Sequence, residues 1–173
     1  MTLHAKLNTR PDEPQMSPAN AAFMATYLDS LLLVERLHRL LLDVIKDEFE
    51  RVGVLEINPV QALLLFNVGH NEVTAGELKS RGYYQGSNVS YNLKKLVDHG
   101  YMHHERSELD RRSVRVRLTQ KGRDIRAIVG KLFITHADGL VSRGVMDQQG
   151  IDDIITSLRR MERYWTEQIR YIY

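Results

Sequence analysis

Apolar residues in the first third of the chain recur at steps of three and four, the spacing of one face of an α-helix. The pattern follows Ser17-Pro18, a typical helix N-cap residue and a proline at the first helical position. Its apolar positions are Phe23, Tyr27, Leu31, Val34, Leu37, Leu41, Ile45, Phe49 and Val52. Gly53 is expected to end a helix about 54 Å long. Because that length exceeds one small core, we expect part of this helix to pack on something beyond its own domain.

Two shorter helices are predicted next. In "NPVQ", Asn58 is the expected N-cap, Pro59 takes the first helical position and Gln61 is the capping-box partner. The apolar run "ALLLF" that follows predicts a buried central helix. The segment "TAGE" at 74–77 is a Thr-x-x-Glu capping box, which predicts a short helix to about Arg81.

A further helix is predicted from about Ser87 to His99. Val89, Leu93 and Leu96 form its apolar stripe. Its other faces carry Ser87, Asn88, Tyr91, Lys94 and Lys95. A short helix, a turn and a longer helix form the helix-turn-helix layout. We favour a recognition helix over an ordinary solvated surface helix, which is more often rich in Glu and Lys.

A β-hairpin is predicted after this helix, with strands in "YMHHERS" (101–107) and "SVRVRLT" (113–119) and the tip "ELDRR" between them. In the second strand, valines and a leucine alternate with Arg115 and Arg117, so the two arginines are expected to point away from the core. A tip with two adjacent guanidinium groups suits the narrow minor groove of DNA. The alternative is an exposed basic hairpin without a partner.

The C-terminal third predicts two amphipathic helices. The apolar positions of the first, with one histidine, are Ile125, Ile128, Val129, Leu132, Phe133, His136 and Leu140. Those of the second are Ile151, Ile154, Ile155, Leu158, Met161, Trp165, Ile169 and Ile172. Aromatic side chains this close to a chain end suggest docking on the same or another subunit. Together with the long first helix, they predict a homodimer formed through both ends of the chain.

Composition indicates a globular protein: 43% of the 173 residues are hydrophobic and 27% are charged. No apolar run approaches the roughly 20 residues of a membrane span, and the N-terminus lacks the apolar region of a signal peptide. We therefore expect a cytoplasmic protein without membrane contact. The chain has no cysteine, which excludes disulfides, thiolate metal sites and control by thiol oxidation.

The charge of the chain is unevenly distributed. Residues 74–122 hold ten Lys or Arg and five Asp or Glu, a net charge of +5. The rest of the chain is then −3, because the total is +2. A basic segment within a slightly acidic scaffold points to a polyanionic partner.

The stretch "SNVSYNLKKLVDHGYMHHERSELDRRSVRVRLTQKG" (87–122) resembles the signature of the MarR family of bacterial winged-helix regulators. The end of the helix matches at Val89, Ser90, Leu93, Leu96 and Gly100. The tip of the wing matches at Asp110 and Arg112, and the segment that leaves the wing matches at Leu118, Thr119 and Gly122. The helix order extends the resemblance to roughly residues 17–172. Tyr91 departs from it, since members often carry Arg or another long polar side chain there.

The resemblance implies a mainly α-helical winged helix-turn-helix fold with a small β-hairpin wing and terminal dimerisation helices. It divides the chain into a tail (1–16), an N-terminal helix (17–57), the DNA-binding module (58–122) and C-terminal dimerisation helices (123–173). A dimer of this kind would bind a pseudo-palindromic operator in double-stranded DNA, with half-sites about 34–36 Å apart.

The same resemblance implies roles for individual side chains. Asn88, Ser90 and Tyr91 would face base edges in the major groove, and Ser87 would lie near a phosphate. Lys94 and Lys95 would bind phosphates. Arg112 would enter the minor groove beside Arg111, and Asp110 would orient Arg112 through a charge-assisted hydrogen bond.

An effector pocket is implied where the dimerisation helices meet the helix-turn-helix module. Its candidates are Leu41, Ile45, Leu63 and Phe66. For any one of these side chains, plain core packing is the simpler explanation. If the pocket exists, a small aromatic or anionic molecule would bind there and change the spacing of the recognition helices.

Catalytic and metal sites receive little support. There is no Gly-rich phosphate loop, no G-x-S-x-G and no paired acid in an apolar setting, so we expect no enzyme and no cofactor. His103 and His104 are neighbours on a strand, so they point to opposite faces and cannot chelate together. A zinc site assembled from distant histidines, as in zinc-responsive members of the family, is left open.

We therefore predict a dimeric, sequence-specific transcriptional regulator, expected to be a repressor that a small ligand releases. Two alternatives remain at this point: an activator of the same fold, and a protein-interaction module that no longer reads DNA.

Overall fold

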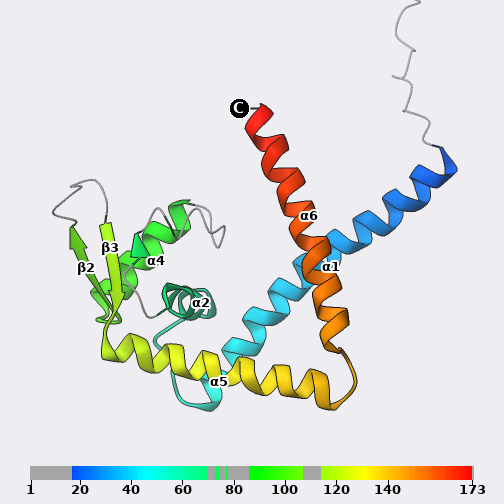
Figure 1. Ribbon diagram of the computed structural model, residues 1–173. Helices are drawn as coiled ribbons and strands as arrows, with labels where there is room; N and C mark the ends of the chain where they lie inside the picture. Colours follow the sequence, from blue (N-terminus) through cyan, green and yellow to red (C-terminus); the bar gives the residue numbers. More distant parts are fainter. Residues whose placement is uncertain (1–16, 70–72, 75–76, 78–85, 107–113, 173) are drawn as a thin grey trace, which may run out of the picture. The chain divides into compact units, whose positions relative to one another are not determined.

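The computed structural model describes residues 17–69, 73–74, 77, 86–106 and 114–172, and for 86–89, 105–106, 114 and 171–172 it describes the backbone alone (Figure 1). The predicted tail, 1–16, lies outside the described residues. The chain divides into two compact units between Val44 and Ile45, within the first helix.

Helix α1, Pro18–Arg51, begins and ends where the sequence predicts. Its first turn is capped by Ser17, whose Oγ accepts a hydrogen bond from the Asn20 amide at 3.3 Å. It ends before Gly53, whose φ of +77° is a conformation that favours glycine. In the first unit this helix leaves a series of large apolar side chains exposed, among them Phe23 (72%), Leu32 (64%) and Leu37 (63%). A helix face of this kind is buried from water only when a partner covers it.

Helix α2, Pro59–Val68, is the centre of the second unit. Asn58 and Gln61 form the predicted capping box, since each side chain accepts a hydrogen bond from the other residue's amide, at 2.9 and 3.2 Å. Its sequence is mostly apolar, which suits a helix that contacts three elements: α4 (Gly86–Asp98), α5 (Gln120–Ser142) and β3 (Val114–Leu118). Leu64 and Leu65 are fully buried there, with Val129 of α5 and Leu96 of α4.

The wing is a three-stranded antiparallel sheet in the order β1-β3-β2, formed by Val73–Thr74, Val114–Leu118 and Met102–Arg106. The sequence predicted only the hairpin β2–β3. The added strand β1 has two residues, too few for any alternation to be visible. Its Val73 pairs with Val116, whose other neighbour is His104 of β2.

Two helices complete the second unit. Helix α5 starts after the N-cap Thr119, whose Oγ1 accepts a hydrogen bond from the Gly122 amide at 3.1 Å. Helix α6, Gln148–Ile172, is amphipathic, and its apolar side chains remain accessible, with Trp165 43% and Ile169 61% exposed. Among the described helices, none combines the length and the apolar character needed to cross a bilayer.

Candidate DNA-binding surface

Helix α4 has a buried apolar face and an exposed polar face, as its sequence predicts. Leu93 and Leu96 are buried at 7% and 1% exposure, on the side that contacts α2 and β2. Ser90, Tyr91, Lys94 and Lys95 are all exposed. The backbone of Ser87 and Asn88 belongs to the first turn of the helix, and their side chains lie outside the described residues.

The exposed side chains of α4 form a continuous stripe, because Tyr91, Lys94, Lys95 and Asp98 are three or four residues apart. Two ammonium groups lie in its middle, and the single carboxylate lies at its C-terminal end. The Nζ atom of Lys95 lies 5.8 Å from the centroid of the Tyr91 ring, within the range of a cation–π contact. The stripe therefore presents positive charge and one aromatic ring to the solvent.

The wing also has two distinct faces. Val116 and Leu118 are buried at 1% and 6% exposure, whereas Arg115 and Arg117 are exposed. The register pairs Arg117 with His103, so arginine and histidine share the outward face. The prediction that Arg115 and Arg117 point outward is confirmed. Asp110, Arg111 and Arg112 of the predicted tip lie outside the described residues.

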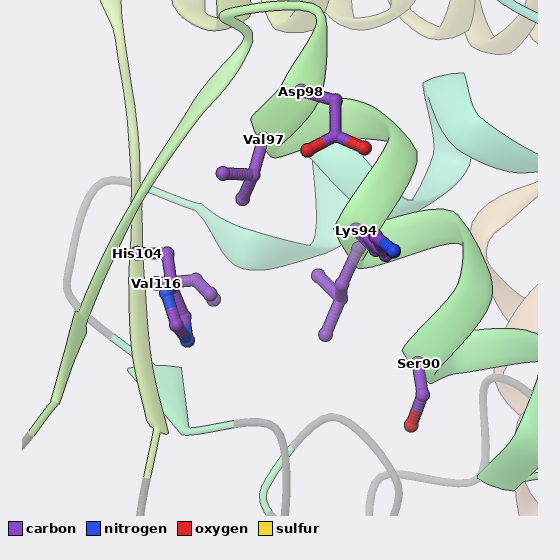
Figure 2. A pocket seen from close by; sticks show the side chains of 7 residues that line it. Ser90, Lys94, Val97, Asp98, His104 and Val116 are labelled. Atoms are coloured by element: carbon purple, nitrogen blue, oxygen red, sulfur yellow. The ribbon is translucent and has the colours of Figure 1, made fainter.

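A pocket of about 320 Å³ lies between α4 and the strands β2 and β3 (Figure 2). Its lining residues are Ser90, Leu93, Lys94, Val97, Asp98, His104 and Val116. In Figure 2, His104 and Val116 project from the strands on one side of the hollow, and Ser90 lies on the helix at the other side. Two of the predicted DNA-binding side chains, Ser90 and Lys94, thus line a space shared with the wing.

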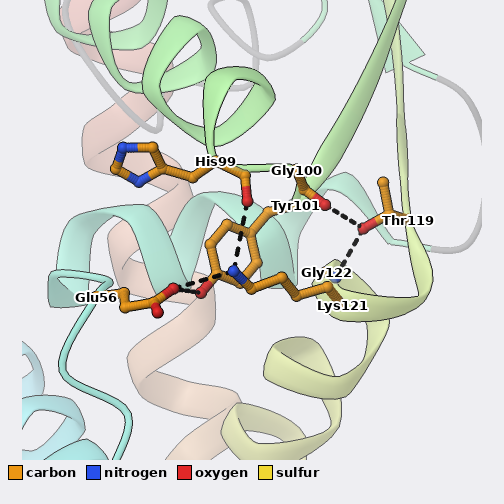
Figure 3. A network of polar contacts seen from close by, with 7 residues as sticks. All are labelled: Glu56, His99, Gly100, Tyr101, Thr119, Lys121 and Gly122. Carbon is orange, nitrogen blue, oxygen red and sulfur yellow. Dashed lines mark hydrogen bonds and ion pairs between the residues drawn. The ribbon is translucent and has the colours of Figure 1, made fainter.

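A polar network holds the base of the wing (Figure 3). The Tyr101 hydroxyl donates to Glu56 Oε2 at 2.9 Å, and Lys121 Nζ donates to the same oxygen at 3.0 Å. The Lys121 Nζ also lies 4.1 Å from the centroid of the Tyr101 ring and 3.4 Å from the carbonyl oxygen of His99. These contacts join three places in the chain: the α1–α2 loop, the start of the wing and the first turn of α5.

The network shifts the pKa values of its members. Hydrogen bonds from Lys121 and then Tyr101 lower the pKa of Glu56, and the bond to Glu56 raises the pKa of Lys121. The pKa of Tyr101 is raised, chiefly by burial and secondly by its bond to Glu56. Glu56 and Lys121 are therefore ionised together across the neutral range, which maintains the ion pair.

The backbone approaches itself closely at the same point. The Thr119 amide donates to the Tyr101 carbonyl at 3.1 Å, and its hydroxyl donates to the Gly100 carbonyl at 2.8 Å. A Cβ atom placed on Gly122 would lie 2.2 Å from that Tyr101 oxygen. Only glycine fits this position, which explains physically why the exit of the wing ends in a glycine. The sequence marked Gly122 and Thr119 as a motif but did not predict this contact or the Glu56 network.

The predicted effector-pocket residues are in part core residues. Ile45 and Leu63 are buried at 0% and 8% exposure, and the half-buried Phe66 packs edge-on against Phe133 with ring centroids 5.0 Å apart. Leu41 belongs to the first unit. The pocket itself stays a prediction. No three His, Asp or Glu side chains of the described ranges come together in a way that could hold a metal ion.

Comparison with known proteins addresses the family directly. Residues 57–122 match the model described as "Winged helix DNA-binding domain". The chain is 35% identical over 148 residues to the exopolysaccharide II synthesis transcriptional activator ExpG of Rhizobium meliloti (strain 1021), covering 86% of this chain and 76% of that protein. Its structure also resembles a MarR transcriptional regulator from Methanosarcina mazei Go1, with 25% identity, a TM-score of 0.58, and coverage of 78% of this chain and 94% of that one.

The chain belongs to the MarR family. It is a winged-helix DNA-binding transcriptional regulator and not an enzyme. The fold is also that of Streptococcus pneumoniae FabT, solved in complex with DNA, at 20% identity, a TM-score of 0.61, and coverage of 83% of this chain and 99% of that one. The residues that match the winged-helix model, 57–122, include α4 and the sheet β1-β3-β2.

Proposed function

We propose that two copies of the chain bind one pseudo-palindromic operator, with α4 of each copy in the major groove and the wing tip in the adjacent minor groove. The observation that carries this proposal is the division of α4 into two faces. Leu93 and Leu96 hold the helix on the core, and Tyr91, Lys94 and Lys95 face the solvent. In this arrangement the two lysines bind phosphates and set the register, while Asn88, Ser90 and Tyr91 contact base edges.

The roles of the wing tip and of the first turn of α4 are part of the same proposal. Arg112, with Arg111 beside it, enters the minor groove, and Asp110 orients Arg112. Ser87 lies near a phosphate at the helix N-terminus. What supports these assignments is the outward-facing Arg115 and Arg117, which extend positive charge along the wing toward that tip.

Homodimerisation is supported by the apolar surface on each unit. In the first unit, α1 exposes Phe23 and Leu37. In the second, α6 exposes Trp165 and Ile169. A monomer would leave all of these side chains in water, at a cost that rises with the apolar area exposed. We assign residues 17–57 and 123–173 to the dimer interface and residues 58–122 to DNA binding.

We propose that the regulator activates transcription. The relative at 35% identity is described as a transcriptional activator of exopolysaccharide synthesis, which favours activation over the repression expected from the resemblance alone. Genes for the synthesis of a secreted polysaccharide are the corresponding target class. Since its partner is chromosomal DNA, we place the protein in the cytoplasm.

Two experiments test this proposal. Selection of bound duplexes from a random pool at near-physiological salt should recover an inverted repeat with half-sites about one turn apart. Recovery of sequences no better than bulk DNA would instead favour the protein-interaction module. A reporter driven from a promoter carrying the recovered operator should then rise when the protein is present; a fall would establish repression.

The phosphate contacts are tested by the salt dependence of binding. Lys94→Ala should weaken binding to every duplex and lower the slope of log K against log salt by about 1 per protomer. Lys131→Ala, which removes an exposed lysine of α5, is the matched control and should leave the slope unchanged. Equal slopes for the two variants would contradict the placement of α4 on DNA.

Control by a small molecule is a further part of the proposal. A ligand in the region of Ile45, Leu63 and Phe66, which all belong to the second unit, would alter the spacing of the two recognition helices. In a thermal-shift screen, a compound that stabilises the protein should also change its operator affinity. If every stabilising compound leaves operator binding unchanged, this part is wrong.

A further inference from the structure

Tyr91 is the one large aromatic side chain on the exposed stripe of α4. It is 62% exposed, although its neighbours on the stripe are two lysines and an aspartate. Its ring lies outside the core, since the buried Leu93 and Leu96 lie on the other face of the helix. An aromatic ring kept in water on a DNA-facing helix is apolar surface available for a partner.

The ring of Tyr91 lies within cation–π range of Lys95. The Lys95 Nζ lies 5.8 Å from the ring centroid, and the two residues are one helical turn apart. A ring ordered in advance loses less conformational entropy when it makes a contact. The lysine is therefore both a charge for the phosphate backbone and a support for the ring beside it.

The major groove offers one apolar group on its base edges, the C5-methyl group of thymine. Lys94 and Lys95, about one helical turn after Tyr91, match phosphates, whereas the uncharged ring beside them matches an apolar group on the base edges. We propose that Tyr91 is a specificity-determining residue that contacts a thymine methyl group in each operator half-site. This inference rests on the proposed function, because it requires α4 to lie in the major groove.

The competing role for Tyr91 is a hydrogen bond from its hydroxyl to a phosphate, which carries no sequence information. The two roles use different parts of the side chain. A ring–methyl contact survives Tyr91→Phe and depends on the methyl group of the base. A hydroxyl–phosphate contact is lost in Tyr91→Phe and is indifferent to that methyl group.

The experiment uses the full-length protein and synthetic operator duplexes recovered by the random-pool selection. Each thymine of one half-site is replaced in turn by uracil, together with its symmetry mate, so that only the methyl group is removed. Losing the burial of one methyl group corresponds to about fourfold in affinity, and the two symmetric sites together to about fifteenfold. We expect this loss at one thymine pair, or at two adjacent pairs, and at no other position.

The variants assign the effect to Tyr91. Tyr91→Phe should keep the full sensitivity to uracil, and Tyr91→Ala should bind the thymine and uracil duplexes with equal affinity. Because Tyr91 is exposed, neither variant disturbs the core, and a thermal melt checks that both are folded. Asp98→Ala, at the C-terminal end of the same stripe, is the matched control and should keep the sensitivity of the wild type.

The outcomes separate this inference from the proposed function. If no thymine position is sensitive to uracil although an operator was recovered, or if Tyr91→Ala retains the sensitivity, Tyr91 does not read a methyl group and the inference is overturned. Loss of affinity in Tyr91→Phe without any uracil effect overturns it as well, in favour of a phosphate contact. If the selection recovers no operator, the proposed function has failed, and with it the premise of this inference.

Discussion

Replacing Gly122 by alanine tests how the wing is joined to α5. The new Cβ would lie 2.2 Å from the Tyr101 carbonyl oxygen and 3.2 Å from its carbon. Because a carbon and a carbonyl oxygen approach to only about 3.3 Å, the wing and the first turn of α5 must separate by roughly 1 Å. Both neighbours are backbone atoms, so no side chain can rotate away to relieve the contact.

The cost follows from the bonds at this junction. Overpacking of this kind costs about 1–3 kcal/mol. The shift also weakens the hydrogen bond from the Thr119 amide to the Tyr101 carbonyl, now 3.1 Å long, which contributes about 1 kcal/mol. Alanine regains at most about 1 kcal/mol of helix propensity over glycine. We therefore expect Gly122→Ala to lower the free energy of unfolding by about 1–3 kcal/mol.

Thermal and chemical unfolding measure this change. A chain of this size should lose roughly 2–12 °C in Tm, and the denaturant midpoint should fall with an unchanged m-value. All variants must be compared at one protein concentration, because a dimer is stabilised by mass action.

Gly130→Ala is the matched control in the same helix. The nearest atom to a Cβ there is Phe66 Cε2, at an ordinary contact distance of 3.7 Å. This variant should be within about 1 kcal/mol of the wild type, or more stable, since alanine favours the helix. The reasoning is refuted if Gly122→Ala is as stable as Gly130→Ala, because the carbonyl contact would then impose no restriction.

Three more changes have defined outcomes. Leu64→Ala empties a fully buried site and should lower the free energy of unfolding by about 2–5 kcal/mol in chemical denaturation. Glu56→Gln should reduce stability at neutral pH, because the Glu56 pKa is lowered in the folded protein. The extra stability of the wild type is full above the ordinary pKa of that carboxyl and disappears as the pH falls through the lowered value. Thermal melts over a pH series would detect this dependence. Trp165→Glu should raise the dissociation constant of the dimer in sedimentation equilibrium, whereas Thr156→Glu, on the opposite face of α6, should leave it unchanged.

Helix ends were predictable from the sequence because capping is local. Asn58 and Gln61 are three residues apart, and the hydrogen bonds between them follow from that spacing alone. The same holds for Thr74 and Glu77, whose reciprocal bonds of 3.1 and 2.6 Å form the predicted capping box. Apart from Glu77, the helix that this box was predicted to open, to about Arg81, lies outside the described residues.

Strand β1 could not be predicted in this way. Val73 and Thr74 have no alternation of their own, and they become a strand only because Val116 and Arg115 lie beside them. The pairing joins residues more than forty positions apart, so it exists only in the tertiary structure. The burial of Val116 is explained by neighbours on both sides, of which the sequence indicated one.

In the candidate DNA-binding surface, too, some features follow from the sequence and others only from the tertiary structure. The sequence alone determined that α4 has an apolar stripe and a basic face and that Arg115 and Arg117 lie on the outward face of the wing, because helical and strand periodicity are properties of neighbouring residues. Only the tertiary structure decided that Glu56, Tyr101 and Lys121 meet, that Gly122 lies against the Tyr101 carbonyl, and that a hollow separates α4 from His104. Such contacts depend on the distance between elements after packing, and no local pattern in the chain records that distance.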